Sequence, residues 1–279
     1  MTVMALCMLP LAACSAQQDT EFKRLAEPVG VTDRTPAMHH LWMWAWLAAF
    51  LVGILVWGLI IYAAFKFRRK PGDESAPVQT RYHLPIEILY TVAPIVMVVV
   101  FFFFTVKTQD EVLKPAADVS GHAAHTIDVV GSQWSWTFNY VKDPALDGQT
   151  SVWFAGTTAH APTLVLPVNE SVRFNLSSPD VIHSFWVPAF LFKMDVIPGR
   201  HNHFSLTPTR TGTFKGRCAE LCGVYHSRML FNVKIVSHAD YAKYLRHLES
   251  IGNTGLALGG SDARTVAGLK PAGQNGAEQ

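Results

Sequence analysis

The sequence predicts a membrane-anchored all-β protein, with an N-terminal two-helix transmembrane hairpin followed by a β-domain. Two apolar runs, 41–65 and 88–106, contain no charged side chain. After residue 126 the pattern changes to short runs rich in Val, Thr, Phe and Trp, separated by turns that contain Gly or Pro. Hydrophobic residues make up 49% of the 279-residue chain and charged residues 16%, which is too apolar for an ordinary soluble protein.

Each apolar run is long enough to cross a membrane. The first has 25 residues, which at about 1.5 Å per residue span a hydrocarbon core of about 30 Å with some tilt. Tryptophans near its start suit the aromatic belt at a membrane interface. The second run has 19 residues, and Pro94 within it predicts a kink. We therefore expect transmembrane helices at 41–67 and 85–106, joined by a loop at 68–84.

The charges beside these runs predict their orientation. The connecting loop and its borders carry Lys66, Arg68, Arg69, Lys70 and Arg81, which outnumber the acids there. By the positive-inside rule the loop is cytoplasmic, so both termini face the periplasmic side of a bacterial inner membrane. The net charge of +2 gives no reason to expect nucleic acid, and membrane lipid is the expected surrounding.

The first residues resemble a bacterial lipoprotein signal peptide. Residues 1–14 are apolar and end in Leu11-Ala-Ala-Cys14, although no Lys or Arg precedes Lys23. In this interpretation Cys14 becomes the lipid-modified N-terminus. Residues 15–40 would then form an external, polar N-terminal segment.

The region after the helices predicts a β-sandwich or Greek-key barrel, because about seven strand-like runs follow one another in about 110 residues. Ser237 is placed to cap a helix over 239–251, with Asp240 three residues further on. The Gly- and Ala-rich tail 252–279 lacks periodicity and is expected to be disordered. We detect no internal repeat. The predicted strands are 126–130, 134–140, 163–168, 171–176, 203–206, 213–217 and 229–236.

One stretch of the β-domain concentrates metal-binding side chains. Cys218-Ala-Glu-Leu-Cys222-Gly-Val-Tyr-His226-Ser-Arg-Met229 places two thiols, an imidazole and a thioether within twelve residues. Each residue alone could be ordinary core packing, but soft sulfur donors and imidazole together favour copper or zinc. The other two cysteines, at positions 7 and 14, lie in the first apolar stretch, so metal binding here leaves no structural disulfide.

Copper fits these donors better than zinc, because thioether is a poor zinc ligand. A single-copper electron-transfer site needs only one Cys, whereas paired thiolates can bridge two copper ions. That arrangement needs a second histidine. The chain has 12 histidines, and His183 is the candidate because it begins a strand-like run in Pro179-Asp-Val-Ile-His183-Ser-Phe-Trp-Val-Pro188.

Three motifs together resemble subunit II of haem–copper cytochrome c oxidases: D-V-I-H-S-F-W-V-P, F-K-M-D-V-I-P-G-R and C-A-E-L-C-G-x-x-H-x-x-M. The resemblance covers about 37–250 and implies a cupredoxin-like Greek-key β-barrel at 107–251. It implies an aerobic respiratory oxidase subunit that takes electrons from cytochrome c and passes them to haem in subunit I. The resemblance also implies that the complex couples oxygen reduction to proton translocation and that the chain has subunit III as a further partner. The implied ligands of a dinuclear copper A centre are His183, Cys218, Cys222, His226, Met229 and the Glu220 carbonyl.

The resemblance also implies roles outside the copper ligands. The Glu220 side chain matches a residue that reaches a magnesium ion shared with subunit I. Trp134, in Gly131-Ser-Gln-Trp134-Ser-Trp136, matches the point of electron entry, although a strand Trp is more often simply packed. Glu87 matches the cytoplasmic mouth of a proton channel, or is a solvated helix end. Asp180 is a candidate for docking a basic cytochrome c.

Two further details qualify this picture. Asp195 and Arg200 are expected to pair with each other or to act across a subunit interface. Pro179 stands where many relatives carry an acid, and residues 107–251 have no excess of acids, so an acidic docking face has little support.

Two other classes of protein remain as alternatives. A membrane-anchored copper chaperone also uses a Cys-x3-Cys pair, but it does not need His226 and Met229. A structural zinc module on a membrane anchor is the other. A quinol oxidase subunit is disfavoured because the copper ligands are present. No Cys-x-x-Cys-His occurs, so the sequence offers no c-type haem attachment.

Overall fold

The computed structural model describes residues 20, 22–69, 71–72, 76, 79–115 and 124–258. The predicted signal peptide, with Cys14, and the tail beyond residue 258 lie outside the described residues. The chain divides into two compact units. One is a helical unit, Ala37–Val112, and the other is a β-domain, which also includes residues that precede the helical unit.

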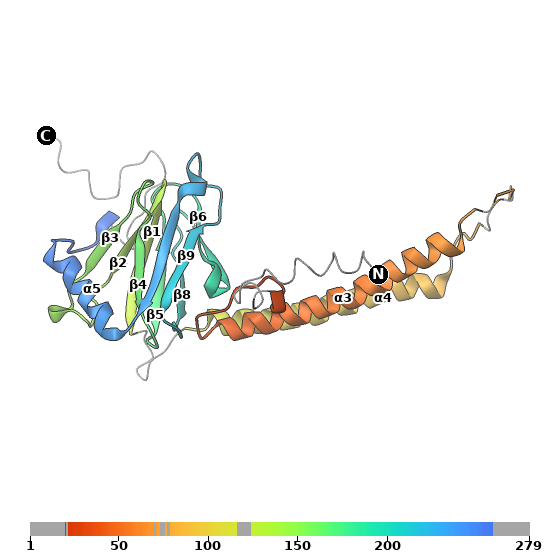
Figure 1. Ribbon diagram of the computed structural model, residues 1–279, viewed down its shortest axis with the longest axis horizontal. Helices are drawn as coiled ribbons and strands as arrows, with labels where there is room; N and C mark the ends of the chain where they lie inside the picture. The colour runs from red at the N-terminus through yellow and green to blue at the C-terminus, as the bar shows by residue number, and fades with distance from the viewer. Residues whose placement is uncertain are drawn as a thin grey trace, which may run out of the picture. The chain divides into compact units, whose positions relative to one another are not determined.

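The helical unit contains two helices, α3 (Thr35–Lys66) and α4 (Leu84–Leu113) (Figure 1). Both are long and apolar enough to cross a membrane, and none of the residues in their apolar windows is buried in the chain. Helix α3 begins before the predicted 41–67 and α4 ends after the predicted 85–106, because backbone hydrogen bonding continues into the residues that flank each apolar stretch. Pro94 lies inside α4 without ending it.

The β-domain is a sandwich of two five-stranded sheets. Strands β1 and β5 are parallel neighbours in one sheet, and β4 and β10 are parallel neighbours in the other. The remaining pairs are antiparallel. The first sheet has the order β3 (Val152–Ala155), β2 (Ser135–Tyr140), β1 (His125–Ser132), β5 (Val172–Ser177) and β8 (Asn202–Leu206). The second has the order β4 (Thr163–Pro167), β10 (Leu230–Val236), β9 (Gly212–Cys218), β6 (His183–Val187) and β7 (Phe192–Val196).

The predicted fold class, two apolar helices followed by a β-sandwich, is confirmed. All seven predicted strands are present with small shifts of their ends. Strand β6 matches the strand-like run expected to begin at His183, whereas β3 and β7 were not predicted. Both are short strands at the edges of their sheets, where strand preference depends strongly on the neighbouring strand.

Aromatic side chains fill the space between the sheets. Phe185 stacks on Phe231 with ring centroids 4.8 Å apart, and Phe174 stacks on Phe204 at 4.8 Å. Trp136 is fully buried and meets Phe185 edge to face at 5.6 Å. Its indole Nε1 donates to the Met229 carbonyl at 3.3 Å, so the core directly supports the metal-binding stretch.

The C-terminal part of the predicted external segment 15–40 pairs with the β-domain. Val31 is fully buried; its N–H donates to the Ala189 carbonyl at 3.1 Å, and its carbonyl accepts from the Thr209 N–H at 2.9 Å. The next residue, Thr32, forms an isolated β-bridge with Pro208. This part of the chain is therefore an additional edge of the sandwich, which its polar composition did not indicate.

Helix α5 (His238–Ser250) follows the last strand as predicted, and the Ser237 hydroxyl accepts from the Asp240 N–H at its start. The tail was expected to be disordered from residue 252. The described part of it, 252–258, instead pairs with the domain. Thr254 bridges to Val152, and the Ala257 N–H donates to the Asn139 side chain at 2.7 Å. Backbone pairing orders these residues despite their weak side-chain signal.

Candidate metal centre

The metal-binding stretch is the connection between β9 and β10. Cys218 ends β9, Met229 immediately precedes β10, and the antiparallel pairing of the strands brings these two ends together. The Cys218 N–H donates to the Met229 carbonyl at 3.0 Å and closes the loop. Gly223 lies in the loop with φ +120°, a conformation that side chains disfavour. The loop is thereby folded back on itself.

His183 reaches the loop from the neighbouring strand. The register of β6 against β9 places Phe185 opposite Cys218, and the Ala219 N–H donates to the Ser184 carbonyl at 3.0 Å. Strand pairing thus brings together side chains that are 35 residues apart in sequence. The Nδ1 atom of His183 lies 3.9 Å from the Cys218 Sγ.

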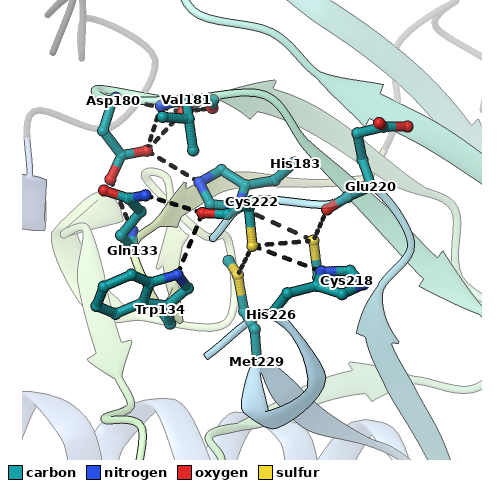
Figure 2. Close-up of polar contacts among 11 residues, drawn as sticks. Gln133, Trp134, Asp180, Val181, His183, Cys218, Glu220, Cys222, His226 and Met229 are labelled. Carbon is teal, nitrogen blue, oxygen red and sulfur yellow. Dashed lines mark hydrogen bonds and ion pairs between the residues drawn. The ribbon is translucent and has the colours of Figure 1, made fainter. Parts of the chain in front are cut away.

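The two sulfur atoms form the middle of the cluster, 3.8 Å apart (Figure 2). Cys218 has His183 beside it, and its Sγ lies 3.2 Å from the Glu220 carbonyl oxygen. Cys222 has the His226 Nδ1 at 3.6 Å and the Met229 Sδ at 3.7 Å. Each thiol is therefore paired with one imidazole and one weaker donor. The donor atoms of His183, Cys218 and Cys222 lie within 4.8 Å of one another, which suits metal coordination.

The environment separates the acidities of the two thiols. Burial raises the pKa of Cys218, but hydrogen bonding to His183 and to the Glu220 backbone outweighs it and lowers the pKa to about 6. Burial and the charge of Cys218 raise the pKa of Cys222 to about 12. Metal-free, the pair therefore keeps one proton at neutral pH, which a thiolate-binding metal displaces.

Asp180 orients the imidazole of His183. Its Oδ1 lies 2.9 Å from the Nε2 of His183, so Nδ1 is the nitrogen that faces the sulfur atoms. Its Oδ2 accepts from the Gln133 N–H at 2.6 Å. Burial raises the pKa of Asp180, but the hydrogen bonds from His183 and from the Gln133 and Val181 backbones lower it overall. Its hydrogen bonds place Asp180 beside the metal centre, and its role in partner docking stays a prediction. Its spacing of three residues before His183 was the available signal.

Trp134 and Gln133 hold the loop from the β1–β2 turn. The Trp134 indole Nε1 donates to the Cys222 carbonyl at 3.1 Å, and the Gln133 side chain donates to the same oxygen at 2.8 Å. Trp134 also meets Tyr225 edge to face at 5.1 Å. Gln133 was not predicted, and nothing in its sequence context distinguishes it from an ordinary turn residue.

The other predicted positions lie apart from this cluster or on its rim. Glu220 offers its carbonyl to Cys218, while its side chain is exposed and points away from the sulfur atoms (Figure 2). Glu87 lies in the first turn of α4 and accepts from the His83 N–H at 2.8 Å. Asp195 lies 3.6 Å from Lys193, and the described residues show no ion pair between Asp195 and Arg200.

Comparisons with known proteins agree with this geometry. The family model described as cytochrome c oxidase subunit II, periplasmic domain, matches residues 125–236. A probable cytochrome c oxidase subunit 2 of Streptomyces avermitilis is 43% identical, with 90% of this chain and 88% of that protein covered. The chain belongs to the cytochrome c oxidase subunit 2 family. The Corynebacterium glutamicum member is 36% identical, with 82% of this chain and 77% of that protein covered.

Among solved structures, the periplasmic domain of subunit II of cytochrome oxidase from Bradyrhizobium japonicum is 30% identical. The superposition covers 46% of this chain and 96% of the Bradyrhizobium japonicum domain, with a TM-score of 0.41. Membership of the cytochrome c oxidase subunit 2 family confirms the resemblance predicted from the three motifs. The chain is a subunit of an oxidoreductase complex, a haem–copper oxidase, and its His/Cys/Cys group fits a copper site.

Proposed function

We propose that the chain is the electron-entry subunit of an aerobic respiratory cytochrome c oxidase. In this proposal His183, Cys218, Cys222, His226, Met229 and the Glu220 carbonyl hold two copper ions. The observation that carries it is the paired arrangement, in which each of two neighbouring thiols has one imidazole and one weak donor beside it. A single ion would need only one such set. When bound, the copper pair supplies a one-electron redox centre.

The surrounding residues support that role by fixing the donors before metal arrives. Asp180 selects the nitrogen of His183 that faces the sulfur atoms, and such supporting contacts tune the ligands of metal sites. The Met229 side chain is fully buried and Cys222 is 3% exposed, so the protein excludes water from the sulfur atoms. A rigid, dry site lowers the reorganisation that accompanies electron transfer.

Trp134 is the proposed point of electron entry from cytochrome c. Its indole is partly exposed and bonds to the carbonyl of Cys222, a ligand residue. It therefore connects the domain surface with the metal centre through one hydrogen bond. Exposed Leu221 and Val224, at 78% and 83%, lie in the same loop and offer apolar contact to a donor.

The proposal includes the rest of the oxidase. Electrons leave this domain for haem in subunit I, where oxygen is reduced to water and protons are translocated. Subunit III completes the complex. The exposed side chain of Glu220 is available to a magnesium ion shared with subunit I, and Glu87 is proposed at the mouth of a proton channel. The basic loop between α3 and α4 supports a cytoplasmic position, with the β-domain and both termini on the periplasmic side.

Spectroscopy of the copper-loaded full chain in detergent tests the proposal. We expect two copper ions per chain, a purple mixed-valence absorption spectrum, and an electron paramagnetic resonance signal shared between two nuclei. A colourless chain that retains zinc would refute it, and a single Cu(I) ion without mixed-valence absorption would indicate a chaperone. Replacing Trp134 with Ala should slow turnover with cytochrome c at normal copper content. Equal turnover would remove Trp134 from the entry role.

A further inference from the structure

The β1–β2 turn forms hydrogen bonds to two of the groups that surround the thiol pair. The backbone N–H of Gln133 donates to the Oδ2 atom of Asp180 at 2.6 Å. The side-chain Nε2 of the same residue donates to the carbonyl oxygen of Cys222 at 2.8 Å. Figure 2 shows Gln133 between these two partners. Because one bond uses the backbone and the other uses the side chain, a side-chain substitution removes the second and keeps the first.

The two partners of Gln133 belong to different halves of the thiol pair. Asp180 lies 2.9 Å from the Nε2 atom of His183, and the Nδ1 atom of His183 lies 3.9 Å from the Sγ atom of Cys218. Cys222 is the thiol of the other half, and its sulfur lies 3.8 Å from that of Cys218. Gln133 therefore connects the half that contains Cys218 with the half that contains Cys222.

The metal-binding stretch packs closely against the turn at Gly223. A Cβ at this position would lie 3.2 Å from the Nε2 atom of Gln133 and 3.1 Å from the indole Nε1 atom of Trp134. These are the two nitrogens that donate to the carbonyl of Cys222. The absence of a side chain at Gly223 lets both donors reach the same oxygen. The contact of Gln133 is therefore part of the packing of the loop against the turn.

The hairpin that carries Gln133 also packs against His183. A Cβ at Gly131, in β1, would lie 3.3 Å from the Cδ2 atom of His183 and 3.0 Å from the ring of Trp136. Glycine thus allows close approach of the hairpin to both halves of the thiol pair, at position 131 for one and at position 223 for the other. Between these two contacts, Gln133 supplies the hydrogen bonds.

We propose that Gln133 is a positioning residue of the metal centre, which holds Cys222 in place relative to the half formed by His183 and Cys218. The inference rests on the proposed function and deepens it, because it assigns a role to a residue that is not a ligand. A fixed carbonyl limits the positions that the Cα and Sγ atoms of Cys222 can take. Cys222 is a proposed copper ligand, so its placement affects the affinity and the redox potential of the centre.

Hydrogen exchange of the metal-free full chain in detergent gives the first test. At neutral pH, Gln133→Met and Gln133→Glu keep the length of the side chain but cannot donate to a carbonyl. Gln133 is an exposed residue, so both variants should fold. The amides of 223–229 should exchange about 2- to 12-fold faster in both, which corresponds to the loss of one ordinary hydrogen bond. The amides of α5 should be unchanged, and equal acceleration throughout the domain would overturn the proposal.

A matched control separates the position from the type of substitution. Gln149→Met makes the same change at an exposed glutamine in the loop before β3. It should leave exchange of the 223–229 amides equal to that of the parent. Acceleration of these amides by the control as large as that caused by Gln133→Met would overturn a specific role of Gln133.

Copper loading gives the spectroscopic test. Both Gln133 variants should retain two copper ions per chain. Their copper affinity in a competition titration should fall within the same 2- to 12-fold range, because the loop spends less time in its binding conformation. The reduction potential should shift, and the electron paramagnetic resonance signal should be shared less equally between the two nuclei. An affinity, potential and spectrum equal to those of the parent would overturn the proposal, and so would an effect confined to Gln133→Glu, which would assign it to the added charge.

A double-mutant cycle tests the connection between the two halves. Asp180→Ala removes the acceptor of the Gln133 N–H, so the turn is held less firmly. The fold-change in copper affinity caused by Gln133→Met should therefore be smaller in the Asp180→Ala background than in the parent. Equal fold-changes in the two backgrounds would show that the hydrogen bonds act independently, and would overturn the connecting role.

The parent chain separates failure of this inference from failure of the proposed function. A parent that binds no copper pair, or whose paramagnetic signal belongs to one nucleus, would refute the proposed function. A parent with the two-copper signal, together with Gln133 variants that match it in exchange, affinity and potential, would refute the positioning role alone.

Discussion

A buried ionic cluster that ties α5 to the sandwich gives the sharpest stability prediction. Asp143 is fully buried, and its Oδ2 accepts from the His125 Nδ1 at 2.9 Å and from the Tyr241 hydroxyl at 2.5 Å. Its Oδ1 accepts from the Ala145 N–H at 2.9 Å. The second ring nitrogen of His125 lies 2.9 Å from Glu170. One carboxylate thus connects α5, β1 and the loop after β2.

Replacing Asp143 with Asn should destabilise the domain by about 3 kcal/mol. In the parent, the two carboxylate oxygens accept from His125, Tyr241 and the Ala145 N–H. In either orientation the Asn amide group places an NH2 where one of these oxygens was, so at least one buried donor loses its acceptor. Such a loss costs about 1–3 kcal/mol, and breaking a buried ion pair costs about 3–5 kcal/mol. The expected loss is a large part of a total stability of about 5–15 kcal/mol.

The same cluster predicts a pH optimum for stability. Burial lowers the pKa of His125, but hydrogen bonds and charge from Asp143 and Glu170 raise it above 6.5 overall. The stabilisation that His125 gives to the folded state is therefore full below about pH 6.5, and it is lost as pH rises through the raised pKa. Burial raises the pKa of Asp143, but hydrogen bonding to His125 lowers it below 3.8 overall. That contribution is present above about 3.8 and is lost as pH falls through the lowered pKa.

Urea unfolding of the full chain in detergent, followed by tryptophan fluorescence and by hydrogen exchange of the α5 amides, measures both effects. The parent should be most stable between about pH 4 and 6.5, and Asp143→Asn should lose stability there and show a shallower decline at higher pH. The control is Asp147→Asn, at an exposed acid of the same loop. A free energy of unfolding within about 0.5 kcal/mol of the parent at pH 6 would refute the reasoning, because surface changes have effects of that size.

Three other substitutions address the metal centre. Met229→Leu conserves volume at a buried site, so the chain should fold and bind copper with a changed reduction potential; an unchanged potential and spectrum would exclude Met229 as a ligand. Asp180→Ala should weaken copper affinity by about 10- to 100-fold in a competition titration, because the acceptor that holds His183 is removed; equal affinity would contradict the positioning role. Gly223→Ala should lower copper retention more than Gly148→Ala. Both glycines have positive φ, but only at Gly223 would a Cβ meet a neighbour, the indole nitrogen of Trp134, at 3.1 Å.

Much of the fold was predictable because its signals are local. The length of the apolar runs requires two helices, and alternation over five or more residues identifies the longer strands. The Ser237 cap is a hydrogen bond between near neighbours in sequence, so α5 was placed within a residue. The short edge strands β3 and β7 and the ordered residues 252–258 were not predictable in this way. Their conformation depends on pairing with another strand: β3 with β2, β7 with β6, and Thr254 with Val152 of β3.

The sequence alone determined most of the donor set, since Cys218, Cys222, His226 and Met229 lie in one loop whose length fits a single centre. Tertiary structure decided how these donors are divided. The pairing of β6 with β9 brings His183 to Cys218 and leaves His226 beside Cys222. It also brought Asp180 within hydrogen-bond distance of the Nε2 atom of His183. Sequence periodicity specifies which face a side chain occupies, but only the register between strands specifies its neighbours.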